Sequence, residues 1–173
     1  MVYAQLTGTV KMQDSVALFD DKHGNVAKTA EALSVTSLAK AITAMRRQKG
    51  ITDEANLNIT PKYLVVPPEL EVTAYQIVNS TAAVDGTNSG VVNPYKGRFV
   101  VVSDAELTDP TAWYLVADAA QHDTIEVTYL NGVENPRLET RQGFDVDGIE
   151  YKVAFDVGVD TIDFRGLYKN AGK

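Results

Sequence analysis

Side chains that could carry out catalysis are few in this chain and lie far apart in the sequence. Its 173 residues include two histidines, His23 and His122, and no cysteine. The lack of cysteine excludes disulfides, zinc–thiolate sites and cysteine nucleophiles. A histidine that acts as a base needs a positioned partner. Asp123 follows His122, but adjacent residues on a strand point to opposite faces. We therefore interpret both histidines as turn residues without a catalytic role.

One acidic run, Asp145-Val146-Asp147-Gly148, resembles the start of a calcium-binding loop. The full loop has a third acidic or amide ligand before its glycine and a glutamate at its end. Here the glycine comes one step after the second aspartate, so the register does not fit. An Asp-Gly pair that follows alternating apolar residues is typical of a tight hairpin turn, and we predict a turn.

Other motifs of catalysis or cofactor binding are missing from the sequence. There is no Gly-x-Ser-x-Gly elbow, phosphate-binding loop or dinucleotide-binding glycine pattern. Gly86 and Gly90 lie in a polar stretch without a following lysine and helix. The sequence predicts no catalytic, cofactor-binding or metal-binding residue and no small-molecule substrate. We therefore expect a protein that is not an enzyme; an unrecognised hydrolase is the alternative that a deep pocket with converging histidines or carboxylates would support.

Composition favours one folded domain without a nucleic-acid footprint. Hydrophobic residues make up 45% of the chain, and the formal net charge is -7. Binding to phosphate backbones needs a basic surface, so we expect no sequence-specific nucleic-acid binding. The basic run Arg46-Arg47-Gln48-Lys49 fits the last turn of a helix, where cations suit the dipole. No apolar run reaches the roughly 18 residues of a membrane span, and Met1 to Gln5 do not resemble a signal peptide. We expect a soluble chain, cytoplasmic when it is made.

Two amphipathic segments predict helices. From Val35 to Lys49, apolar residues recur every three or four positions. Ser34 or Thr36 can cap the first amides, and Gly50 fits a left-handed stop. The second helix is expected from Pro68 to Asn79, since a first-turn proline loses no helical hydrogen bond.

Short apolar runs predict strands around these helices. Candidate strands cover residues 63–66, 99–102, 113–116 and 124–130; the β-branched run 99–102 suits a strand buried on both faces. Residues 79–97 are polar and predict an exposed loop. Between Ile149 and Val157 apolar and polar residues alternate, which predicts a half-buried strand. Gly158 to Asp160 predict a turn, after which Ile162 and Phe164 resume the alternation. The class is α+β, with a mostly antiparallel sheet flanked by two main helices.

Several sequence blocks, in this order, resemble one family. They are Ala17-Leu18-Phe19, His23-Gly24-Asn25, the stretch Leu57 to Glu71, Trp113-Tyr114-Leu115, and the stretch Asp163 to Asn170. The Pro67-Pro68 block and the C-terminal block are the most specific. Together they resemble the major capsid (head) protein of Mu-like tailed phages and prophages, over most of the chain.

This resemblance implies the tailed-phage capsid fold of the Hong Kong ninety-seven type. The chain would be a single capsid-type module, with the axial domain at about 30–140 and peripheral-domain strands at about 1–25 and 141–173. We expect the N-terminal arm, the extended loop that clasps neighbours and the spine helix to be missing, because no long helical pattern precedes Val35. The loop 79–97 is the expected contact around the capsomer axis.

The implied function is that of a structural subunit of an icosahedral phage or prophage capsid. Such subunits self-assemble into pentamers and hexamers that enclose DNA. Other capsid subunits would be the partners, and the virion, or the bacterial cytoplasm during assembly, would be the location. Alone, this chain is expected to be a monomer or small oligomer. Another phage head or tail module is the alternative.

Overall fold

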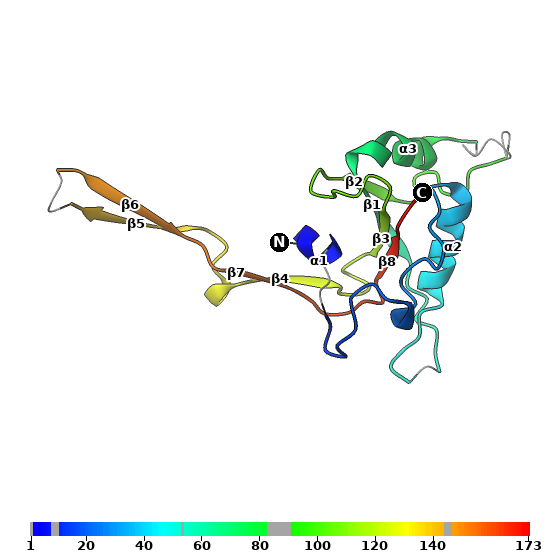
Figure 1. Ribbon diagram of the computed structural model, residues 1–173, viewed down its shortest axis with the longest axis horizontal. Coiled ribbons are helices and arrows are strands. Elements are labelled where there is room, and N and C mark those ends of the chain that lie inside the picture. Colours follow the sequence, from blue (N-terminus) through cyan, green and yellow to red (C-terminus); the bar gives the residue numbers. More distant parts are fainter. Residues whose placement is uncertain (1, 8–10, 53, 83–90, 144–146) are drawn as a thin grey trace.

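The computed structural model describes residues 2–7, 11–52, 54–82, 91–143 and 147–173. Two parts are visible in it: a body of helices and strands, and a long two-stranded ribbon that projects away from the body (Figure 1). The elements in chain order are α1 (Val2–Thr7), α2 (Val35–Arg46), β1 (Pro61–Val66), α3 (Pro68–Asn79), β2 (Val100–Ser103), β3 (Trp113–Ala117), β4 (Ile125–Tyr129), β5 (Arg137–Gln142), β6 (Ile149–Ala154), β7 (Val157–Thr161) and β8 (Leu167–Asn170).

A four-stranded sheet with the order β2-β1-β3-β8 forms the centre of the body. The pairs β1–β3 and β3–β8 are antiparallel, whereas β1 and β2 are parallel. A parallel pair needs a crossover connection, and α3 provides it, because Pro67 and Pro68 end β1 and start the helix. The predicted α+β class with a mostly antiparallel sheet and two main helices is confirmed.

Both predicted helices are present, and α3 has the predicted bounds. Helix α2 begins with a capping box in which Ser34 and Ser37 satisfy each other's amides; of the two candidate caps, the structure selects Ser34. The predicted C-terminus at Lys49 was too late, since α2 ends at Arg46. The left-handed stop at Gly50 was also wrong: its amide donates to the Ala55 carbonyl, at 3.1 Å, as the chain turns back.

Alternation along the central strands places side chains on both faces of the sheet. Trp113 and Leu115 pack in one apolar cluster with α2 and α3. Tyr114 packs in a second cluster with Leu6 and Leu18 of the N-terminal segment. The sheet is therefore covered on both faces. Strand β2 lies at its edge, and Val100 is 50% exposed. The expectation that this strand is buried on both faces was wrong, because β2 pairs only with β1 within the sheet.

The ribbon consists of two antiparallel pairs in succession, β4–β7 near the body and β5–β6 beyond it (Figure 1). Gly158 and Asp160 lie inside β7 and do not form the predicted turn. The strand predicted to continue through Ile162 and Phe164 is absent at these described residues, where the chain turns towards β8. The alternation from Ile149 onwards does form strands, but β6 is not half-buried: its residues are exposed except for Ala154, which is intermediate.

Candidate interaction surface

The outer half of the ribbon has two faces of opposite character. Residues directly opposite each other in an antiparallel pair lie on the same face. Leu138 pairs with Val153, and Gln142 pairs with Ile149, on either side of the Thr140–Tyr151 pair. This set, Leu138, Thr140, Gln142, Ile149, Tyr151 and Val153, is called the apolar face below. The register leaves the charged residues of both strands on the other side.

The apolar face is open to solvent in this chain. Leu138, Ile149, Tyr151 and Val153 are each between 61% and 67% exposed. Burying one such side chain stabilises a complex by roughly 1.5–3 kcal/mol. An isolated two-stranded hairpin is marginally stable in water. A large unpartnered apolar surface on such an element marks a site of protein contact.

The charged face is held by ion pairs across the two strands. Arg141 Nη2 lies 2.7 Å from Glu150 Oε2, and Lys152 Nζ lies 3.2 Å from Glu139 Oε2. Arg137 approaches Glu139 as well, at 3.0 Å. The hydrogen bond from Lys152 lowers the pKa of Glu139 below its ordinary value. These exposed pairs contribute little to stability, but they fix which face of the ribbon carries charge.

The inner half of the ribbon is attached to the body. Gln5 of α1 donates its side-chain amide to the Val159 carbonyl of β7, at 3.2 Å. Between the halves, one strand carries a seven-residue insertion, residues 130–136, that the other does not match. Asn131 and Gly132 have positive φ values there, 55° and 70°. The two halves are thus joined through a turn and do not form one continuous ladder.

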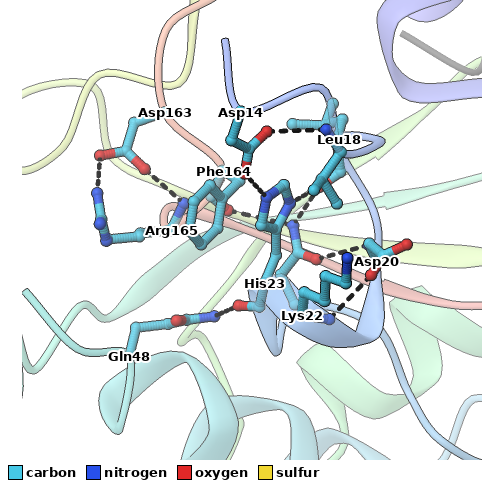
Figure 2. Close-up of polar contacts among 11 residues, drawn as sticks. Asp14, Leu18, Asp20, Lys22, His23, Gln48, Asp163, Phe164 and Arg165 are labelled. Atoms are coloured by element: carbon cyan, nitrogen blue, oxygen red, sulfur yellow. Dashed lines mark hydrogen bonds and ion pairs between the residues drawn. The ribbon is translucent and has the colours of Figure 1, made fainter. Parts of the chain in front are cut away.

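His23 lies at the root of the ribbon, where β7 returns to the body (Figure 2). It follows a short 3-10 turn, is 5% exposed, and stacks on Phe164 with ring centroids 3.9 Å apart. Its Nδ1 lies 3.1 Å from the Leu18 carbonyl, and its Nε2 lies 2.8 Å from Asp14 Oδ2. The hydrogen bond from His23 is the main cause that lowers the pKa of Asp14. Sequence reasoning placed His23 in a turn but missed its burial.

His122 lies on the other strand of the same root. Its Nε2 is 3.2 Å from Asp163 Oδ2, although no hydrogen-bond geometry is met among the described residues. Asp163 also accepts from Arg165 Nη1 at 2.8 Å. The neighbour that the sequence suggested, Asp123, is not the partner. Asp163 and Arg165 were expected to reach partners across strands, but they pair with each other.

A cleft of about 830 Å³ lies at this root. Its lining includes Lys11, Asp14, Glu126, Asp160, Asp163 and Arg165. Among the described residues no group of three or more histidine, cysteine or acidic side chains could hold a metal ion. In the candidate calcium run, Asp145 and Val146 lie outside the described residues, and Asp147 and Gly148 lie in the turn before β6. No helix in the described part of the chain is long and apolar enough to cross a membrane.

The loop expected from residue 79 to 97 is only partly exposed. Residues 83–90, which include Gly86 and Gly90, lie outside the described residues. Asn93 is 4% exposed and donates to the carbonyls of Ile77 and Ser80, while Tyr95 is 7% exposed. The second half of the loop is therefore anchored on the end of α3.

Comparison with known proteins identifies the kind of protein that carries this ribbon. A family model described as phage capsid protein matches residues 1–170. No curated protein matches the chain. The fold is similar to that of the holo-SrpI encapsulin complex from Synechococcus elongatus, with 10% identity, a TM-score of 0.51 and coverage of 98% of this chain and 61% of the other.

A satellite phage P4 procapsid that includes the size determination (Sid) protein is also similar, with 13% identity, a TM-score of 0.41 and coverage of 94% and 44%. The chain thus spans less than two thirds of the length of these two chains. The family match covers almost every residue, and the chain belongs to this phage capsid protein family.

Proposed function

We propose that the chain is a structural subunit of an icosahedral phage or prophage shell and that its ribbon is a clasp between neighbouring subunits. It acts through surfaces and not through an active site. The proposal includes the Mu-like resemblance, the Hong Kong ninety-seven type of fold, and assembly into pentamers and hexamers that enclose DNA. It locates the chain in the virion, and in the bacterial cytoplasm during assembly.

The exposed apolar face of the ribbon is the observation that carries this proposal. Leu138 and Val153 form a register pair on that face, and neither has a covering element in the chain itself. A monomeric protein gains nothing from holding these side chains in water on a projecting hairpin. A second copy that covers them would gain the free energy of their burial. The sequence led us to expect no extended loop, and the ribbon is the element that we assign to that role.

The body fits the proposed axial domain. Its central sheet, with α2 and α3 on one face, lies within residues 30–140 together with β8. In this assignment the anchored segment around Asn93 and Tyr95 supports the loop that meets its neighbours around the capsomer axis. The N-terminal segment and the return strands belong to the peripheral part.

Two double variants on adjacent register pairs test the clasp. Leu138→Ser with Val153→Ser changes the apolar face, while Glu139→Gln with Lys152→Gln changes the next pair, on the charged face. Sedimentation velocity and light scattering over a concentration series would measure self-association. We expect the wild-type chain and the charged-face variant to form small oligomers, and the apolar-face variant to stay monomeric. A wild-type chain that stays monomeric throughout, or equal association of all three proteins, would contradict the proposal.

A further inference from the structure

Both histidines of the chain lie beside carboxylates at the root of the ribbon, although 99 positions separate them in sequence. His23 contacts the return strand through Phe164, and His122 precedes β4, the outgoing strand. Asp163 and Phe164 are neighbours in the turn that joins β7 to β8. The two rings therefore hold the same turn from two sides.

The contacts of His23 require a ring that carries both protons. A backbone carbonyl and a carboxylate are both acceptors, and each faces one ring nitrogen. A neutral ring has a single N–H, so it would turn a lone pair either to Leu18 O or to Asp14. In both cases one contact becomes repulsive inside a site where the ring is 5% exposed. The charged ring satisfies both acceptors.

His122 follows the same logic with looser geometry. Its Nε2 is buried, has no hydrogen-bond partner among the described residues, and faces Asp163 at 3.2 Å. A neutral ring leaves this nitrogen unpaired, which costs stability in a buried position. A charged ring gains an ion pair with Asp163 and ties the outgoing strand to the return turn.

Other charged groups at the root set the balance. Around His23, Asp14 favours the charged ring, and Arg165, whose guanidinium lies 4.9 Å from the Phe164 ring centre, opposes it. Asp20 and Lys22 lie on the same turn, and Gln48 at the end of α2 donates only to the His23 carbonyl. Around His122 the acidic side chains of its own segment are Asp118 and Asp123. Acidic groups therefore outnumber the cations that face the two rings.

We propose that the two histidines form a proton-dependent lock on the root of the ribbon, closed when the rings are charged and released when they lose a proton. This inference rests on the proposed role of the ribbon as a clasp, because the lock would then control how firmly the clasp is held. Histidine is the side chain that changes charge between about pH 5 and 8. The sign is fixed by the contacts: the folded root binds the extra protons better than the open root, so raising the pH loosens it.

Hydrogen exchange of the monomeric chain tests the lock directly. Peptides that cover residues 11–27 and 160–167 should lose protection between about pH 5 and 8, by up to about tenfold per pH unit for each proton released, after correction for intrinsic rates. Peptides of β1 and β3 are the internal control and should keep theirs. His23→Gln should remove the pH dependence of residues 11–27, and His122→Gln that of residues 160–167.

Two outcomes overturn the lock: wild-type protection that does not change with pH, or a change that persists when both histidines are replaced. If His23→Gln does not fold, Asp14→Asn tests the same contact on a half-exposed residue and should weaken the pH dependence of residues 11–27. Because these measurements use dilute monomer, they can succeed where the association experiment fails, and the reverse. The lock and the clasp can thus be rejected separately.

Discussion

Leu138 and Val153 face each other across the outer half of the ribbon, and both remain more than 60% exposed. The next pair along the ladder, Glu139 and Lys152, lies on the opposite face and is joined by an ion pair. One register step thus separates an apolar surface from a charged one. Within the chain the charged pairs are satisfied and the apolar pairs are not.

Folding stability should not depend on this apolar pair. Leu138→Ser with Val153→Ser removes side chains that are already in water, so the free energy of unfolding should change by no more than about 0.5 kcal/mol. Leu115→Ala, in the core at 0% exposure, should cost about 2–5 kcal/mol. Urea unfolding of dilute protein, followed by the fluorescence of the buried Trp113, measures both. A loss of several kcal/mol in the ribbon variant would mean that its apolar face supports the body and is not free to bind a neighbour.

The helix cap at Ser34 should be worth a measurable part of the stability. Ser34 Oγ accepts from the Ser37 amide at 3.1 Å, and Ser37 Oγ accepts from the Ser34 amide at 2.9 Å. Ser34→Ala should cost about 1 kcal/mol. Thr36→Ala is the matched control two residues on, exposed in the first turn, and should be neutral or slightly stabilising because alanine is the better helix former. Thermal unfolding followed by circular dichroism compares them; equal losses would argue against the capping box.

Sequence patterns predicted the body better than the ribbon, for physical reasons that particular residues illustrate. Helix α3 was predicted with its bounds because Pro67-Pro68 and the apolar spacing act locally. The end of α2 was misplaced because the turn after Arg46 depends on contacts with Ala55 and beyond. Local propensity cannot report such contacts.

The ribbon was misjudged because alternation shows which residues share a face but not what covers that face. Strand β5 was missed, although Leu138 and Thr140 alternate with Glu139 and Arg141 in its sequence. That charge alternation was the available signal. The histidine contacts could not be foreseen, because the separations from Asp14 to His23 and from His122 to Asp163 carry no local pattern. They arise when the return turn packs against the body.

The ion pair between Lys62 and Asp118 should make stability fall in acid and in strong alkali. Lys62 Nζ lies 2.6 Å from Asp118 Oδ2; this hydrogen bond lowers the pKa of Asp118 and raises the pKa of Lys62. The carboxylate contribution is present above the ordinary aspartate value of 3.8 and is lost as pH falls through the lowered pKa. The lysine contribution is present below 10.5 and is lost as pH rises through the raised pKa.

Asp118→Asn should therefore lower the melting temperature at pH 7 and lose this effect in acid, where the wild-type carboxyl is protonated. Asp123→Asn, at an exposed position outside the ion pairs that the structure describes, is the control and should leave the melting temperature unchanged at both pH values. A difference between wild type and Asp118→Asn that persists undiminished in strong acid would show that the pair is not its cause.

Gly166, in the turn before β8, should not tolerate a side chain. A Cβ at this position would lie 2.4 Å from Thr124 Cγ2 and 3.0 Å from His122 Cδ2. Gly166→Ala should destabilise the protein by about 1–3 kcal/mol, the usual cost of overpacking. Thr124→Ser removes the nearer methyl group, so the double variant should recover part of that loss, and a double-mutant cycle measures the coupling. Gly148→Ala, which meets no atom within 4 Å, is the control and should change stability little. Additive losses in the cycle would show that the return turn is not packed against the outgoing strand at this point.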